Sequence, residues 1–337
     1  LQGDVGSGKT AVAACAALRA VESGFSVVVL APTEILAEQH YRVFGKWLEP
    51  LGIPVHLHTG ARKTMSDPGQ PELSMGNNEL PPLVIGTHAL VEEKFKLENM
   101  GLAIIDEQHK FGVEQRKKLV SKGQYPHVLV MTATPIPRTL GLTVYGDLDI
   151  SLIDELPPGR GPVRTHVRKP ESLPKVWGFI RDKLAGGRQA YVVYPRVDDA
   201  EGGSLKAVNQ ELDNVREQLA PHAVGLLHGR LKSAEKEQVI TGFLAGKIKV
   251  LLATSVIEVG VDIPNATIML IENADRFGLA QLHQLRGRIG RGAHESHCIL
   301  VADEVTDDGR RRLDVMEKGG DGFELAEEDL RQRGPGE

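Results

Sequence analysis

The sequence predicts an α/β fold of two tandem domains, each a mostly parallel sheet flanked by helices. Short aliphatic runs alternate along the chain with helical patterns, an order that favours parallel sheets. Most of the runs are continuously apolar, which is typical of strands covered by helices on both faces. The length of 337 residues suits about two domains of ordinary size.

The elements follow in order along the chain. The predicted strands are Ser26–Leu30, Leu83–Ile85, Leu102–Ile105, Val128–Met131, Ala190–Tyr194, Val224–Leu227, Val250–Ala253, Thr267–Ile271 and Cys298–Val301. The predicted helices are Thr10–Ser23, Glu34–Leu48, Ser172–Leu184, Leu205–Leu219 and Ser233–Leu244. Residues 61–82 contain several prolines and read as a loop.

The domain boundary is expected where the chain cannot continue a helix or a central strand. The Pro- and Gly-rich stretch 156–162 is such a place. It predicts a first domain over 1–155, a linker over 156–162 and a second domain over 163–305, followed by a charged extension over 306–337. Because the sequence starts at Leu1 and ends abruptly at Glu337, we expect a piece of a longer protein.

Composition excludes several classes of protein. The chain is 41% hydrophobic and 25% charged, as in globular and not disordered proteins. Its apolar runs are far shorter than the ~18 residues of a membrane helix. A formal net charge of −5 argues against a wholly basic nucleic-acid coat, although a local basic groove remains compatible with it. Two cysteines, Cys15 and Cys298, exclude a disulfide framework or a Cys-based zinc site and favour a reducing compartment.

The first motif is a phosphate-binding loop. Residues 3–10 match G-x-x-x-x-G-K-[ST] in full. Backbone N–H groups of such a loop turn toward phosphate oxygens, and the following helix points its positive end at the same place. Lys9 would reach the β- and γ-phosphates, and the Thr10 hydroxyl would bind Mg²⁺. The expected nucleotide-binding residues are Gly3, Asp4, Gly6, Ser7, Gly8, Lys9 and Thr10. The strand that precedes such a loop is expected upstream of Leu1.

A carboxylate pair should complete the metal and hydrolysis site. Asp106 and Glu107 follow the predicted strand Leu102–Ile105, at the edge where ligands bind in open α/β sheets. Asp106 would hold Mg²⁺ through water, and Glu107 would orient and deprotonate the attacking water. His109 follows Glu107 by two residues, which would place it close enough to sense the γ-phosphate.

A basic cluster forms the second half of the proposed site. Gln284, Arg288 and Arg291 are spaced i, i+4, i+7 and would share one face of a helix. Gly287 and Gly290 within it disfavour a helix but permit close approach to another surface. Two arginines there could stabilise the charge that develops on a transferred phosphoryl group. The alternative interpretation of this cluster is a basic helix that is exposed to solvent.

Small polar residues also follow several predicted strands. Hydroxyls and backbone N–H groups at strand ends suit nucleic-acid phosphates, so we predict a phosphate-backbone track. No aromatic series accompanies them, so base stacking is secondary. The residues expected to bind DNA or couple it to the nucleotide are Pro32, Thr33, Thr87, His88, His109, Thr132, Thr134, His228, Gly229 and Thr254.

Taken in order, these motifs resemble those of superfamily 2 helicases of the DEAD/DEAH type, and most closely those of the RecG family. Residues 3–10 resemble motif I, 31–40 motif Ia, 106–109 motif II, 132–134 motif III, 253–264 motif V and 284–291 motif VI. The more specific strings are 2–10, 106–116, 131–139, 153–159, 257–266, 277–292 and 321–337, so the resemblance covers nearly the whole chain.

The resemblance implies two RecA-like domains with ATP and Mg²⁺ between them. Lys9, Thr10, Asp106 and Glu107 would act from the first domain, and Gly260, Asp262, Gln284, Arg288 and Arg291 from the second. The family's activity would be ATP-dependent movement on duplex and branched DNA, by a monomeric motor in the bacterial cytoplasm, with no membrane partner. Thr132 to Thr134 would link nucleotide state to DNA grip. Residues 61–82 depart from the family, which has a helical region there.

Three other functions remain open at this point, one of which is a protein-translocating ATPase with the same motor architecture. The motor of the transcription-repair coupling factor shares much of the motif series, although Gln108 and His109 after the carboxylate pair favour the RecG family. A nucleotide-binding module without turnover is the alternative from another class. The retention of Glu107, Arg288 and Arg291 argues against such a module.

Overall fold

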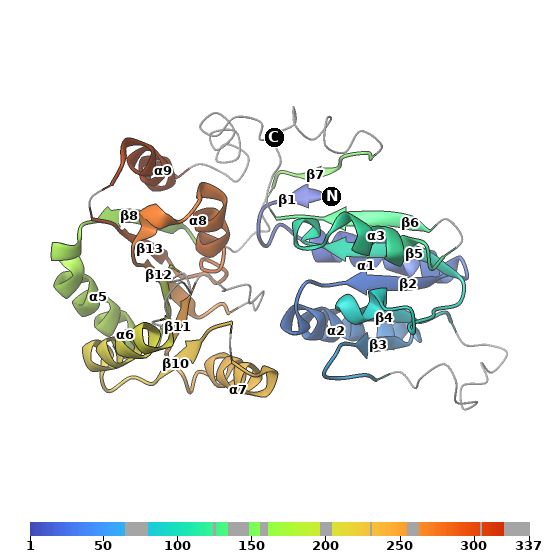
Figure 1. Cartoon of the computed structure of the whole chain (residues 1–337), viewed down its shortest axis with the longest axis horizontal. Helices are drawn as coiled ribbons and strands as arrows, with labels where there is room; N and C mark the ends of the chain where they lie inside the picture. Colours follow the sequence, from blue (N-terminus) through green and yellow to red (C-terminus); the bar gives the residue numbers. More distant parts are fainter. Residues whose placement is uncertain are drawn as a thin grey trace.

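The computed structural model describes residues 1–64, 80–123, 126–133, 148–155, 161–195, 204–229, 231–254, 263–303 and 305–319. Figure 1 shows two α/β halves side by side, the first in blue to green and the second in yellow-green to red. Each half is built on a parallel sheet, with strand order β3-β4-β2-β5-β6 in the first and β10-β11-β9-β12-β13-β8 in the second. The predicted fold class is therefore confirmed.

The first sheet is covered on both faces. Its strands are β2 (Ser26–Leu30), β3 (Val55–His58), β4 (Leu83–Gly86), β5 (Met100–Asp106) and β6 (His127–Met131), and its helices are α1 (Lys9–Glu22), α2 (Glu34–Leu48) and α3 (Val113–Val120), with short 3-10 turns η1 (Glu49–Leu51), η2 (His88–Val91) and η3 (Gln108–Lys110). Val27 and Val29 pack under α1 and α2, whereas Val28 and Leu30 pack toward α3 and η2. This two-sided burial explains why β2 is apolar at every position after Ser26.

The second sheet is covered in the same way. Its strands are β8 (Val163–Arg168), β9 (Gln189–Tyr194), β10 (Val224–Leu227), β11 (Val250–Thr254), β12 (Ala266–Ile271) and β13 (Ser296–Val301). Its helices are α5 (Leu173–Ala185), α6 (Ser204–Leu219), α7 (Ser233–Leu244), α8 (Leu279–Arg286) and α9 (Asp307–Lys318), with η4 (Pro170–Ser172) and η5 (Ala274–Arg276). One core lies against α5 and α6, and the other against α7, α8 and α9.

A short strand ahead of the phosphate loop corrects one expectation. Gln2–Gly3 form β1, which pairs in parallel with β7 (Leu152–Ile153) and bridges to Thr132 at the end of β6. The end of the strand that precedes the loop is thus present in the sequence. A strand of two residues is too short to show a hydrophobic periodicity, so sequence analysis could not detect it.

Sequence prediction missed the strands that are exposed on one side. Apart from the helix expected through Arg291, the predicted strands and helices agree with the observed elements to within two residues at each end. The strands β3 and β8 were not predicted. Each lies at the edge of its sheet and alternates aliphatic residues or Thr with His or Arg, as in Val55-His56-Leu57-His58, so neither forms a continuous apolar run. In the described part of the chain, none of the helices has the length and apolarity needed to span a bilayer.

Candidate nucleotide site between the two halves

The phosphate loop is shaped by glycines with left-handed backbone. Gly6 has φ 76° and Gly8, which precedes α1, has φ 101°. Both angles are costly for residues with a Cβ atom. The turn is closed by the Ser7 amide, which donates to the Asp4 carbonyl at 3.1 Å. The Lys9 ammonium folds back and donates to the carbonyl oxygens of Gly3 and Asp4, each at 2.8 Å. The loop therefore gathers its donors at the N-terminus of α1, where an anion is favoured.

The carboxylate pair lies at the end of β5. Asp106 Oδ2 is 2.8 Å from Nε2 of His40, a buried residue of α2. Burial alone would raise the pKa of Asp106, but the His40 contact and the Lys9 charge lower it below its ordinary value. Burial and the adjacent Asp106 raise the pKa of Glu107, against the opposing charges of Lys9 and Arg288. The two neighbouring carboxyls are thus pushed toward opposite protonation behaviour, an arrangement found at hydrolytic sites.

These residues fit a magnesium ion. Mg²⁺ is commonly held by one or two carboxylates together with substrate phosphates. An ionised Asp106 and the half-buried Thr10 hydroxyl at the start of α1 provide such a donor set. Among the described residues no cluster of three or more His, Cys, Asp or Glu side chains is arranged to hold a metal by itself.

The arginines of the second half face this pair. Burial lowers the pKa of Lys9, and the Arg291 charge lowers it further, against the raising effect of Glu107, Asp106 and Asp4. Burial and Arg291 lower the pKa of Arg288, whereas Glu107 and Asp106 raise it. These mutual effects show that Arg288 and Arg291 lie close to the phosphate loop and the carboxylates.

The predicted helix through Arg291 is wrong in its length. Helix α8 ends at Arg286, so it contains Gln284 but not the two arginines. Gly287 caps the helix, and Gly290, with φ 76°, turns the chain away. Arg288 and Arg291 stand on this turn, where Arg291 Nε donates to the Gly287 carbonyl at 3.2 Å. The i, i+4, i+7 spacing therefore does not place these three side chains on one helical face.

Among the described residues, contacts at Gly287, His283 and Ile35 join the halves. A Cβ atom built on Gly287 would lie 2.8 Å from Cβ of Val5, so the two backbones approach more closely than an alanine would permit. His283 Nε2 of α8 is 3.5 Å from Asp4 Oδ1 of the phosphate loop. Ile35 of α2 packs against the core of the second half. The close approach expected at Gly287 is thus observed, and its partner is the phosphate loop itself.

The strand-end residues of the first half share one edge. In the sheet, Leu30 pairs with Gly86 and Ile105, and Asp106 pairs with Met131, so these strands end side by side. This places four predicted track residues near Asp106. They are Pro32, Thr33, Thr87 and Thr132, and exposed His88 follows Thr87. The Thr33 side chain also caps α2, because it accepts from the Leu36 amide at 3.3 Å. Thr87 Oγ1 is buried and has no hydrogen-bond partner among the described residues.

The remaining predicted positions belong largely to the second half. His228 and Gly229 follow β10, whose end pairs with that of β11, and the Gly229 carbonyl accepts from Lys236. Thr134, Gly260 and Asp262 lie outside the described residues, as do the side chains of His109 and Thr254.

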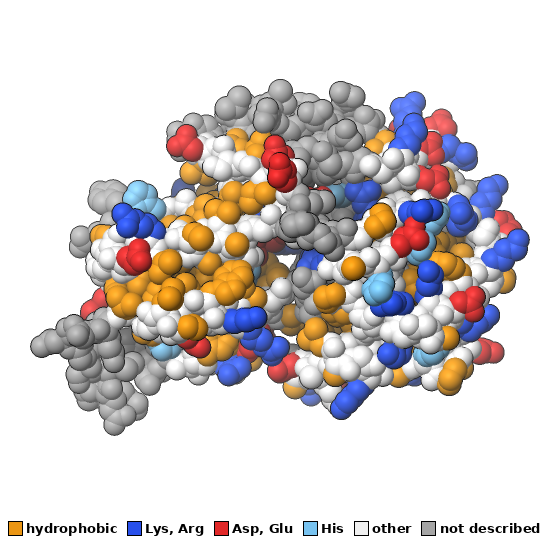
Figure 2. Space-filling model, turned by 180° about the vertical axis from the view of Figure 1, so that it is seen from behind, with side chains coloured by type: hydrophobic (Ala, Val, Ile, Leu, Met, Phe, Trp, Pro, Cys, Tyr) orange, Lys and Arg blue, Asp and Glu red, His pale blue; other side chains and the backbone are white. Residues whose placement is uncertain are grey.

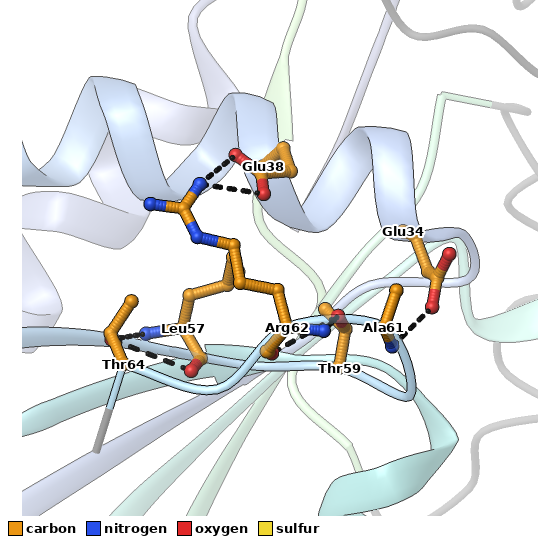
Figure 3. A network of polar contacts seen from close by, with 7 residues as sticks. All are labelled: Glu34, Glu38, Leu57, Thr59, Ala61, Arg62 and Thr64. Carbon is orange, nitrogen blue, oxygen red and sulfur yellow. Dashed lines mark hydrogen bonds and ion pairs between the residues drawn. The ribbon is translucent and has the colours of Figure 1, made fainter. Parts of the chain in front are cut away.

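A segment that sequence reasoning did not single out adjoins the same edge. After β3, residues 59–64 are fixed to α2, as Figure 3 shows. The Ala61 amide donates to Glu34 Oε1 at 3.0 Å, and Arg62 Nη1 lies 3.1 Å from Glu38 Oε1. Because His58 pairs with Gly86, this segment extends the polar strand ends beyond Thr87.

Sequence reasoning also overlooked three buried titratable residues. His40 and His283 contact Asp106 and Asp4, respectively, from elements distant in sequence. Glu272 follows β12, and burial together with the nearby Glu211 raises its pKa to about 7. His40 and His283 could have been found from the sequence because they lie within the motif-like segments 31–40 and 277–292, respectively. Glu272 directly follows an apolar strand, at the same kind of position as Asp106.

Charge is mixed over the surface away from the site. Figure 2 shows lysine and arginine side chains interspersed with acidic ones over the described surface of the second half, seen from behind. No continuous basic surface is visible among the described residues on this face. Contacts to nucleic-acid phosphates would therefore depend on local donors such as the strand-end loops.

Comparison with known proteins shows that the chain matches two helicase family models. Residues 1–142 match the family model described as DEAD/DEAH box helicase, and residues 169–293 match the helicase conserved C-terminal domain. The whole chain is 52% identical to the ATP-dependent DNA helicase RecG of Synechocystis sp. and covers 40% of it. It is 47% identical to RecG of Bacillus subtilis, again over the whole chain, and covers 49% of that protein.

Solved structures agree with these matches. A structure of RecG bound to a three-way DNA junction has a TM-score of 0.81 and 43% identity, and the match covers the whole of this chain and 44% of that one. Yeast Dbp5 bound to RNA and ADP BeF3 has a TM-score of 0.64 at 18% identity over the whole chain and 83% of Dbp5, which shows the shared fold. The chain spans less than half the length of the RecG proteins that it matches. It belongs to the RecG family of DEAD/DEAH box helicases, of which it carries the two helicase domains.

Proposed function

We propose that the chain is the ATP-driven motor of a DNA helicase that, in its longer protein, moves on duplex DNA and remodels branched DNA. One observation carries the proposal. Arg288 and Arg291 of the second half stand beside Lys9, Asp106 and Glu107 of the first, close enough to shift one another's pKa values. A triphosphate held there would touch both halves, so its hydrolysis would change how they fit together.

The first half would bind the nucleotide. Lys9 would exchange the carbonyls of Gly3 and Asp4 for β- and γ-phosphate oxygens, while the loop amides bind the remaining oxygens. Thr10 and Asp106 would hold Mg²⁺, which when bound neutralises phosphate charge. His40 keeps Asp106 ionised for that role. The bounds that we propose for the two domains stay at 1–155 and 163–305, joined by 156–162 and followed by 306–337.

The chemical step would use Glu107 and the two arginines. Glu107 would orient the attacking water and accept its proton, for which a raised pKa is favourable at neutral pH. Arg288 and Arg291 would stabilise the charge on the transferred phosphoryl group. Resemblance to the family supports nucleotide contacts from Gln284, Gly260 and Asp262 as well.

DNA would lie along the strand ends. The ends of these strands, with Pro32, Thr33, Thr87 and Thr132, would offer backbone donors to phosphates, and His228 and Gly229 would serve the second half. His88, His109, Thr134 and Thr254 remain proposed contacts by motif. Branched DNA is proposed because similar proteins are named RecG and one was solved on a three-way junction. We also propose a monomeric motor in a bacterial cytoplasm.

A steady-state ATPase assay tests the proposal. The protein should hydrolyse Mg-ATP, and duplex or three-way-junction DNA should raise kcat. Lys9→Ala serves as the matched inactive control. A folded protein that binds ATP without turnover, with and without DNA, would support a nucleotide-binding module instead. Stimulation by linear duplex and not by a junction would favour the motor type of the transcription-repair coupling factor.

A further inference from the structure

Asp4 connects the phosphate loop to the second half of the molecule. Its side-chain Oδ1 accepts from the Val5 amide at 2.6 Å and lies 3.5 Å from Nε2 of His283. Its backbone carbonyl accepts from Lys9 at 2.8 Å and from the Ser7 amide at 3.1 Å. One residue thus contacts α8 through its side chain and the Lys9 ammonium through its backbone.

The contact is enclosed at the seam between the halves. The side chains of His283 and Asp4 are 5% and 25% exposed. Burial alone would raise the pKa of Asp4, but the His283 contact, the Val5 amide and the charge of Arg286 lower it. An ionised Asp4 therefore takes its donors and nearby positive charge from α8 and its own loop. Four residues beyond His283, Gly287 approaches Val5 closely, so this portion of α8 abuts the loop twice.

Neither half needs this contact to form its core. Each sheet has its own pair of apolar layers, and Asp4 and His283 belong to neither. The contact joins residues 279 positions apart and contributes to neither core. Its loss should therefore change how the halves fit together more than whether they fold.

We propose that His283 is a positioning residue, which holds Asp4, and with it the phosphate loop, in a fixed place relative to Arg288 and Arg291. The inference rests on the proposed function, because it assigns a role within ATP hydrolysis. The two arginines follow His283 by five and eight residues, on the turn that directly continues α8. Movement of α8 against the first half would thereby reach the phosphate loop through Asp4 and the bound phosphates through the arginines.

The test is a double-mutant cycle on ATP hydrolysis. His283→Ala should lower kcat about tenfold, in the range expected for residues in contact, while KM for ATP stays within about twofold. Asp4→Asn should have a similar effect, and the double variant should be no slower than the single ones. His283→Gln keeps an N–H donor and should restore most of the rate. His294→Ala, which removes an exposed histidine of the same half, should leave kcat unchanged.

Hydrogen exchange gives a readout that does not depend on turnover. The Val5 amide is bonded to Asp4 Oδ1, so exchange in the peptide that contains residues 1–10 should accelerate in His283→Ala and recover in His283→Gln. Wild-type kcat and unchanged exchange in His283→Ala, or independent effects of the two single substitutions, would overturn the inference. A wild-type protein without ATPase activity would refute the proposed function instead, and the exchange experiment would still decide the role of His283. If His283→Ala fails to fold, the cycle of His283→Leu with Asp4→Asn decides, because leucine fills much of the space but has no donor.

Discussion

The Gly287→Ala substitution probes the seam without disturbing the backbone of either half. Gly287 has φ −65° and ψ −8°, angles that alanine adopts freely. The added methyl group would lie 2.8 Å from Val5 Cβ and 3.0 Å from its Cγ2. Carbon atoms normally pack at about 3.5–4.0 Å, so the phosphate loop and α8 must separate by about 1 Å.

That separation should lower the rate of ATP hydrolysis. A misplacement of about 1 Å costs on the order of a hundredfold in rate, because the arginines no longer meet the phosphoryl group in register. We therefore expect kcat for Mg-ATP to fall between about ten- and a hundredfold, with ATP binding retained. Overpacking costs about 1–3 kcal/mol, but only where the halves cannot move apart. The melting temperature should consequently change little.

The assay combines steady-state hydrolysis, nucleotide binding and thermal unfolding. Gly178→Ala is the matched control, because it also adds a methyl group to a glycine of the second half. There the nearest atom within 4 Å, at 3.9 Å, belongs to the flexible Arg181 side chain. That control should keep full activity. Wild-type hydrolysis by Gly287→Ala, or a loss of activity that only follows a loss of folded protein, would refute the reasoning.

Three further predictions concern single side chains. Lys9→Ala should weaken ATP binding, measured by calorimetry, about tenfold or more, because charge-assisted hydrogen bonds to phosphate are lost; unchanged binding and turnover would remove Lys9 from the site. Glu107→Gln should retain ATP while single-turnover hydrolysis falls about 10²- to 10⁴-fold, and a normal rate would mean that another group is the base. The pKa of Glu272 is about 7 in the fold against 4.5 ordinarily, so the wild type loses stability as pH rises between these values. Glu272→Gln has no such proton, and its free energy of unfolding relative to wild type should rise by up to about 3 kcal/mol from pH 4.5 to 7 in urea titrations; a difference independent of pH would contradict the assignment.

Local chemistry made much of the site predictable. The phosphate loop and the carboxylate pair are short motifs in which residues adjacent in sequence act together, so both can be recognised from the sequence alone. The register of a parallel sheet then fixes which strand ends become neighbours. Residues after β2, β4, β5 and β6 could be grouped correctly before any contact was known.

Contacts between distant elements were not predictable in this way. His40 reaches Asp106 across 66 positions, and His283 reaches Asp4 only because the halves meet. The predicted helix extends too far because it follows the i, i+4, i+7 spacing and disregards Gly287 and Gly290. Gly290 adopts a left-handed backbone, which ends the helical course of the chain. The strands β3 and β8 were not predicted because their aliphatic residues or Thr alternate with His or Arg, whereas the edge strands β6 and β10 are nearly continuous apolar runs.

The central claim is that a triphosphate bound to the first half is cleaved with arginines from the second. Single-turnover hydrolysis by Arg291→Ala, with ATP affinity measured in parallel, tests it most directly. Arg311→Ala, at an exposed position of α9, is the control. The account predicts affinity within a few-fold of wild type and hydrolysis slowed by about a thousandfold. Hydrolysis at the wild-type rate, with only DNA binding weakened, would contradict it.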